Sequence, residues 1–191
     1  SKSFLADIII LSFIVMASVR LFLKKNPRSS LFDISPPVLG LLYIPCLLTF
    51  QTRLREFGPE WVIILYAMVW AADTFAFYIG TLIGKRKLYV EVSPKKTLSG
   101  AAGSLIGGAV AAVLLKTAFI PALNMTTALA VGITIGIVSI VGDLVESMFK
   151  RDAGVKDSGV IIPGHGGILD KIDGVLFAGP ILYWILLIKG N

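Results

Sequence analysis

The chain has 191 residues, of which 55% are hydrophobic and 16% charged, and its mean hydropathy is +0.84. Soluble globular domains carry about 25% charged residues, so this composition excludes a soluble enzyme, a disordered tail and a disulfide scaffold. The net charge of +6 does not require a nucleic-acid partner, because surplus cations in membrane proteins face anionic headgroups. We therefore expect an integral membrane protein in contact with the lipid bilayer and not with nucleic acid.

Six stretches are apolar enough to cross a bilayer, which takes about 20 residues. The first lacks a cleavage site of small residues, so we expect a membrane span and not a signal peptide. The second is short and contains Pro45, which predicts a tilted, kinked or incomplete span, and the last contains Pro180. The sequence predicts an all-α fold, a polytopic transmembrane helical bundle with about six spans: 4–23, 37–50, 61–84, 99–120, 126–149 and 172–188.

The distribution of positive charge predicts the orientation. Six crossings place the connections 24–36, 85–98 and 150–171 on one side of the membrane. With Arg20 at the edge of the first, these connections hold 13 of the 18 cations. Because cations stay inside, we expect this face to be cytoplasmic, on the inner membrane if the source is bacterial.

Pairs of glycines lie one helical turn apart in two of the later spans. Gly103 and Gly107 form one such pair, and Gly132 and Gly136 form another. Small residues at this spacing favour close helix–helix packing over a role in ligand binding. A homodimer seam stays open as an alternative.

Two carboxylates, Asp73 and Asp143, lie inside predicted spans. A carboxylate that faces lipid costs several kcal/mol, so such residues usually face a cavity, a partner or an ion. For Asp73 the alternative is a structural hydrogen bond or a buried pair between helices. Asp143, Glu146 and Ser147 share one helical face, and Lys150 follows Glu146 by four residues, which by itself fits a plain surface ion pair.

The connection that follows is dense in groups that bind phosphate. Its cations Lys150, Arg151 and Lys156 could simply bind lipid headgroups, but they are interleaved with carboxylates and glycines. Glycines at 164, 166 and 167 let backbone amides approach a phosphate closely. His165, the only histidine of the chain, lies among them.

Asp170 and Asp173 lie one helical turn apart at the mouth of the last span. One of them could simply cap free amides at the start of the helix. Carboxylates and phosphate oxygens are also the ligands that Mg²⁺ prefers. The residues alone therefore predict a cytoplasmic site for phosphate and a divalent metal, without naming a reaction.

The segment 147–173 resembles the signature of the phosphatidate cytidylyltransferases, also called CDP-diacylglycerol synthases. It reads Ser-x2-Lys-Arg-x4-Lys-Asp-x5-Pro-x-His-Gly-Gly-x2-Asp-Lys-x-Asp. A second block, from Asp73 to Lys85 and on to Ser93-Pro-Lys-Lys-Thr97, is similar to an upstream block of the same family. The chain departs from the family at Lys171, where arginine is common, and at Leu98 and Ser99, where Trp and Glu are usual.

The resemblance covers roughly residues 60–188. It implies that CTP and phosphatidate react to CDP-diacylglycerol and pyrophosphate, with Mg²⁺ as cofactor, in phospholipid biosynthesis. It also implies a catalytic membrane domain at 61–191, with cytoplasmic loops 85–98 and 150–171, after less characteristic N-terminal spans at 1–60. Family members usually carry further N-terminal spans, so we expect that some are missing here or that the chain is a short member.

The resemblance also suggests roles for individual residues. We expect the metal at Asp143, Asp170 and Asp173, and a catalytic set of Asp143, Lys150, Arg151, His165 and Asp170. His165 would donate a hydrogen bond to phosphate and would not act as a base. The expected substrate-binding residues are Ser93, Lys95, Lys96, Ser147, Lys156, Gly164, Gly166, Gly167 and Lys171. Asp73 and Glu146 are intramembrane polar residues to which no role is assigned.

Two other functions remain as alternatives. One is a related lipid enzyme that uses CTP, such as a polyprenol kinase or an archaeal-lipid cytidylyltransferase. The other is a secondary transporter in which Asp73 and Asp143 couple cation movement to transport. A transporter explains the intramembrane carboxylates but not the cytoplasmic cluster of cations and glycines. The chain contains no P-loop motif, which disfavours an ordinary P-loop ATPase.

Overall fold

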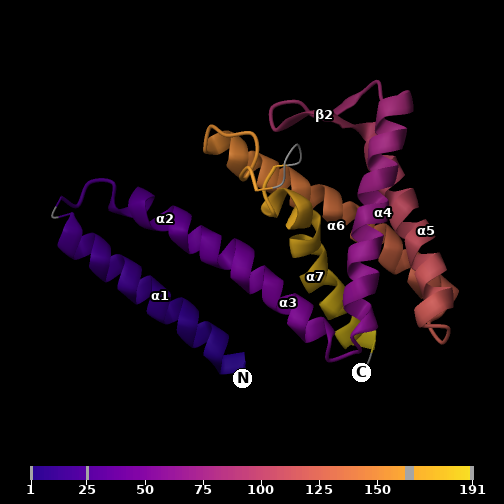
Figure 1. The fold of residues 1–191 in the computed structure, drawn as a ribbon, viewed down its shortest axis with the longest axis horizontal. Coiled ribbons are helices and arrows are strands. Elements are labelled where there is room, and N and C mark those ends of the chain that lie inside the picture. The colour runs from indigo at the N-terminus through magenta and orange to yellow at the C-terminus, as the bar shows by residue number, and fades with distance from the viewer. Residues whose placement is uncertain (1, 25, 162–165, 190–191) are drawn as a thin grey trace. The chain divides into compact units, whose positions relative to one another are not determined.

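The computed structural model describes residues 2–24, 26–161 and 166–189 (Figure 1). In this part of the chain, six helices are long and apolar enough to cross a membrane. The predicted all-α, six-span architecture is therefore confirmed. The helices group into two compact units, residues 1–49 and 50–191, which are described separately below.

The first unit contains α1 (Lys2–Leu23), α2 (Ser30–Leu41), a π-helical segment (Leu42–Cys46) and the start of α3 (Leu47–Leu54). Arg20 closes the connection between α1 and α2. Its Nε donates to Asp33 Oδ2 at 2.6 Å, and its other nitrogens donate to three backbone carbonyls of the connection. The ion pair therefore fixes the loop between the first two spans.

The second span is longer than predicted. The helical path continues from Ser30 to Leu54 and does not stop at the expected limits of 37 and 50. Pro45 lies in the π-helical segment, where the wider turn accommodates a residue that cannot donate a backbone hydrogen bond. The proline thus changes the local helix type without ending the span.

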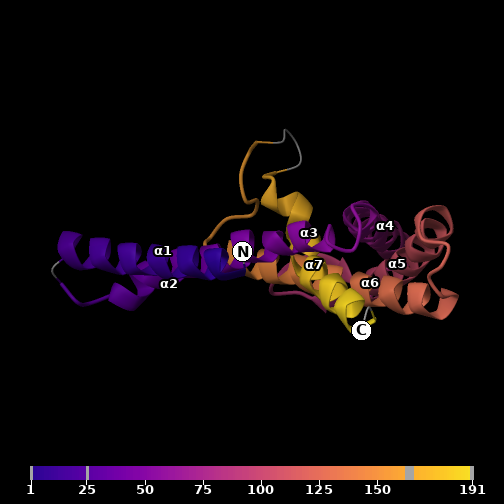
Figure 2. The ribbon, with the colours of Figure 1, turned by 90° about the horizontal axis from the view of Figure 1, so that it is seen from below.

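The second unit is a bundle of α4 (Glu60–Ile83), α5 (Leu98–Phe119), α6 (Met125–Asp152) and α7 (Leu169–Lys189). Helix α4 packs against the other three, and α6 also packs against α5 and α7 (Figures 1 and 2). In Figure 1 the connections after α4 and after α6 leave the bundle at its upper end. The turn between α5 and α6 and the end of α7 lie at the lower end, as expected for successive crossings.

The connection after α4 contains a β-hairpin that the sequence analysis did not predict. Strands β1 (Lys87–Tyr89) and β2 (Ser93–Thr97) are antiparallel, with Lys87 opposite Thr97. Helix α5 follows β2 directly, and the Thr97 hydroxyl caps it by accepting from the Gly100 amide at 3.1 Å. Because strand and helix are continuous, the side chains of β2 are held in a defined position beside the bundle.

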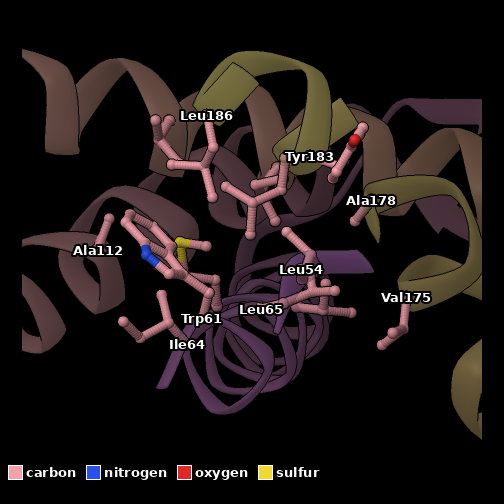
Figure 3. Packing of buried hydrophobic residues seen from close by; sticks show 14 of the residues in the cluster. Leu54, Trp61, Ile64, Leu65, Ala112, Val175, Ala178, Tyr183 and Leu186 are labelled. Atoms are coloured by element: carbon pink, nitrogen blue, oxygen red, sulfur yellow. The ribbon is translucent and has the colours of Figure 1, made fainter. Parts of the chain in front are cut away.

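The apolar core fills the bundle away from the hairpin. Leu54 and Leu65 are fully buried, and Tyr183 packs edge-on against Phe50 and Phe57. Figure 3 shows residues of α3, α4, α5 and α7 converging in this core. The core anchors one end of the bundle and leaves the hairpin end for polar groups.

The spaced glycines hold helices in backbone contact. A Cβ added to Gly107 would lie 2.6 Å from the Ala71 carbonyl oxygen of α4, and one added to Gly136 would lie 2.6 Å from the Ser104 carbonyl oxygen of α5. Ser104 Oγ also donates to the Gly136 carbonyl at 3.0 Å. The predicted close helix–helix packing is confirmed, and it occurs within the chain.

We expect Gly136→Ala to lower the thermal unfolding midpoint in detergent, because the new methyl group pushes α5 and α6 apart. Overpacking of this kind costs about 1–3 kcal/mol. The matched control is Gly40→Ala in α2, where an added Cβ meets nothing within 4 Å. That substitution should leave the midpoint unchanged or raise it, since alanine favours a helix. Equal midpoints for the two variants would contradict this account of the packing.

Candidate functional site

A cavity of about 590 Å³ lies at the hairpin end of the second unit. Residues of α4, the hairpin, α5, α6 and α7 line it. One part of its wall is apolar and includes Ala76, Phe77, Leu88, Ala101 and Ile140. The other part is charged: Asp73, Lys87, Lys95, Lys96, Asp143, Glu146, Lys150, Asp170 and Asp173.

Three carboxylates gather on the charged wall. One oxygen from each of Asp143, Glu146 and Asp173 lies within 4.8 Å of the other two. Asp143 and Glu146 are one turn apart on α6, and close contact between α6 and α7 brings Asp173 beside them. A Cβ on Gly142 would lie 2.7 Å from the Asp173 carbonyl oxygen, so only a glycine allows this approach.

Glu146 is the most deeply buried of the three, with 1% of its surface exposed. Its Oε2 accepts from Lys150 at 2.7 Å, whereas its buried Oε1 has no hydrogen-bond partner among the described residues. A buried carboxylate oxygen without a donor is costly. The cluster therefore has one free oxygen that suits a cation.

Lys150 joins two carboxylates on different helices. Its ammonium donates to Glu146 Oε2 on α6 and, at 2.6 Å, to Asp170 Oδ1 at the start of α7. The predicted helix-surface pair with Glu146 is thus present, but it is buried and shared with a second helix.

Asp170 fastens the loop that precedes α7. Its Oδ2 accepts from the Ser158 amide at 2.9 Å, the Ser158 hydroxyl at 2.7 Å and the Gly167 amide at 2.7 Å. Gly166 has a φ of +89°, and a Cβ there would lie 2.7 Å from this same oxygen. The two ends of the loop therefore meet at one carboxylate.

Asp143 and Asp73 have different partners. Lys96 Nζ lies 2.5 Å from Asp143 Oδ2, and the Ser147 hydroxyl donates to Asp143 Oδ1 at 3.3 Å. Asp73 accepts from the Ser139 hydroxyl of α6 at 2.9 Å. Asp73 thus makes the helix–helix hydrogen bond that the sequence left open, and it also lines the cavity.

The structure separates some residues that the sequence analysis grouped together. Arg151 donates to the carbonyl of Val92 at 3.3 Å and to that of Val155 at 3.0 Å, and it does not line the cavity. Six described residues that were predicted to bind substrate also lie outside the lining: Ser93, Ser147, Lys156, Gly166, Gly167 and Lys171. Gly164 and His165 lie outside the described residues, so their predicted roles stay predictions.

Sequence reasoning did not identify Ser139 or Ser158, nor did it group Glu146 with the metal carboxylates. The helical spacing of Glu146 from Asp143 was a usable signal, since it places both on one face. The partners of Ser139 and Ser158 are 66 and 12 residues away in sequence, so no local pattern reveals them.

The arrangement has two chemical capacities. Clustered carboxylate oxygens bind hard cations such as Mg²⁺, and lysine ammonium groups bind phosphate oxygens. An apolar wall beside them suits a ligand that is both lipidic and anionic. The fold and the cavity define an α-helical integral membrane protein with a polar site at one end of its helical bundle.

The comparisons name the family. The chain belongs to the cytidylyltransferase family, whose sequence model matches residues 2–189. A phosphatidate cytidylyltransferase from Synechocystis sp. is 38% identical over 90% of this chain and 69% of its own length. Those from Staphylococcus haemolyticus and Staphylococcus aureus are 37% and 38% identical over 96% of this chain and 69% of theirs. The predicted family is confirmed, and the chain is a nucleotidyltransferase.

We expect Asp170→Ala to release the loop before α7. Amide hydrogen exchange at Ser158 and Gly167 should accelerate about tenfold or more, because both amides lose their acceptor. Lys171→Ala, which removes an exposed side chain one residue away, is the control and should leave both amides protected. Unchanged protection in Asp170→Ala would show that the loop is held by other contacts.

Proposed function

We propose that the chain is a phosphatidate cytidylyltransferase that converts CTP and phosphatidate into CDP-diacylglycerol and pyrophosphate at the cytoplasmic face of the membrane. Its relatives carry this name over 90–96% of the chain. The observation that carries the proposal is the cavity itself. It places carboxylates and lysines beside an apolar wall within membrane-spanning helices, which matches a substrate with a phosphate head and acyl chains.

We propose that Asp143, Glu146 and Asp173 would hold Mg²⁺. Their oxygens lie close enough together to share one ion, and the free buried Oε1 of Glu146 supports this choice. Asp170, which the sequence suggested as a ligand, is left out because its Oδ2 already accepts three hydrogen bonds from the loop. Its role here is to position Lys150 and the loop.

In the proposed reaction, a phosphate oxygen of phosphatidate attacks the α-phosphorus of CTP. The bond from this phosphorus to the oxygen that bridges to the β-phosphorus breaks, and pyrophosphate leaves with the electron pair. Bound Mg²⁺ would offset the charge of the phosphate groups. Since phosphatidate is already an anion, the chain needs no strong general base.

The lysines of the cavity reduce the repulsion between two anionic substrates. Lys95 and Lys96 enter from the hairpin and Lys150 from α6, so positive charge reaches the cavity from two sides. Such charges stabilise a phosphoryl transition state when they are fixed in place beforehand. Arg151 contributes by holding the hairpin through the Val92 carbonyl, and we assign it a positioning role.

The apolar wall would guide the lipid. Phe77 and Ile140 line the cavity from α4 and α6, and the Phe77 side chain is largely exposed on the bundle surface. Acyl chains can therefore lie along the helices in the bilayer while the phosphate reaches the charged wall. The basic connections support the proposed orientation, because cations are enriched in the cytoplasmic loops of membrane proteins.

Purified protein in detergent should release pyrophosphate only when CTP, Mg²⁺ and phosphatidate are all present. The lipid product should be CDP-diacylglycerol, identified by mass spectrometry. Release with a polyprenol or an archaeal-type lipid, and not with phosphatidate, would contradict the proposal. It would show that the chain is one of the related lipid enzymes instead.

Asp143→Asn should lower turnover about 100-fold or more, because it removes one charge from the cation site. The matched control is Asp152→Asn, an exposed carboxylate at the end of the same helix and outside the cavity lining. It should keep turnover within about twofold, as surface changes usually do. Full activity in Asp143→Asn would remove this residue from the site.

A further inference from the structure

The ion pair between Lys96 and Asp143 has a consequence beyond charge balance. Lys96 Nζ lies 2.5 Å from Asp143 Oδ2, and Asp143 is one of the three clustered carboxylates. The oxygen that forms this ion pair is also an oxygen that a bound cation would need. The protein thus carries a positive charge of its own at the edge of the cluster.

Lys150 provides the contrast within the same cavity. It is held by two carboxylates on two helices, and its side chain is 14% exposed. Lys96 forms an ion pair with a single carboxylate, and its buried Nζ has no hydrogen-bond partner among the described residues. Its flexible four-carbon stem projects from β2, whose backbone is fixed by its continuity with α5. Of the two, Lys96 is the one that can leave its partner.

We propose that Lys96 competes with the divalent cation for Asp143, and that cation binding transfers its ammonium group to a substrate phosphate. The inference rests on the proposed function, because it takes the carboxylate cluster to be a cation site. An ammonium group and a divalent ion on one carboxylate repel each other strongly at protein dielectric. When the cation binds, the released ammonium stays in the cavity, where it would bind a phosphate group of the substrate.

This exchange links two binding events through one residue. Without the cation, Asp143 and Lys96 neutralise each other, and the cavity offers phosphate one positive charge fewer. With the cation, both the ion and Lys96 face the phosphate groups. Cation binding therefore prepares the site for the anionic substrates, and without the cation Lys96 compensates the charge of Asp143.

The first test uses the unmodified chain, labelled with an amine-reactive reagent and analysed by peptide mass spectrometry with and without Mn²⁺. Lys96 should react several-fold faster with Mn²⁺, because its buried amine leaves the carboxylate and becomes accessible to the reagent. Lys85, in the same connection but outside the cavity lining, should react at an unchanged rate. An unchanged or slower reaction of Lys96 with Mn²⁺ bound would overturn the inference.

The second test measures Mn²⁺ binding from the electron paramagnetic resonance signal of the free ion, without nucleotide or lipid. Lys96→Met should bind Mn²⁺ roughly tenfold more tightly than the unmodified chain, since a competing charge is gone. Lys85→Met should match the unmodified chain. Weaker or equal binding by a folded Lys96→Met would overturn the inference.

The same measurement separates this inference from the proposed function. Mn²⁺ binding that Asp143→Asn abolishes supports the cation site whatever Lys96 does. If the unmodified chain binds no Mn²⁺, the proposed cation site fails, and the role of Lys96 fails with it. If Mn²⁺ binds but Lys96 neither reacts faster nor weakens binding, only the role of Lys96 fails.

Discussion

The contact on which the site depends is the ammonium of Lys150 between Glu146 and Asp170. These groups lie at the ends of membrane helices, where a charge without a partner is expensive. The shared ammonium offsets the charge of both carboxylates, and they in turn offset its own. Because Asp170 also holds the loop before α7, this one lysine connects α6, α7 and the loop. The charged wall of the cavity therefore depends on the contacts of Lys150.

Small residues determine where the carboxylates meet. In water, apolar surface would draw helices together, but in lipid the helices gain from close packing and hydrogen bonds. At Gly142 the backbones of α6 and α7 come into contact. At Gly174 of α7, an added Cβ would lie 2.6 Å from the Ser139 hydroxyl oxygen of α6. The acids are therefore placed by backbone contact and not by long, mobile side chains. Such placement preserves distances that a catalytic site needs.

The parts of the molecule that could be predicted from sequence are those decided locally. Span positions follow from hydropathy, and the shared face of Asp143 and Glu146 follows from helical spacing. The extension of the second span past Pro45, the β-hairpin and the partner of Asp170 could not be predicted in this way. They depend on how helices and loops meet in space, which a single sequence does not display. For the same reason the sequence placed Arg151 at the substrate, whereas the structure places it on the hairpin backbone.

The length of α6 bears on how deep the carboxylate cluster lies in the bilayer. Its 28 residues span about 42 Å, which exceeds the roughly 30 Å hydrocarbon layer of a bilayer. Asp143 follows the first residue of the helix by 18 positions, or about 27 Å, which is comparable to the thickness of that layer. A helix that starts at one boundary of the layer would therefore bring Asp143 near the phospholipid headgroups at the other. A bilayer of mismatched thickness would shift the carboxylates away from the plane of the lipid phosphates, which makes membrane thickness itself a determinant of access to the site.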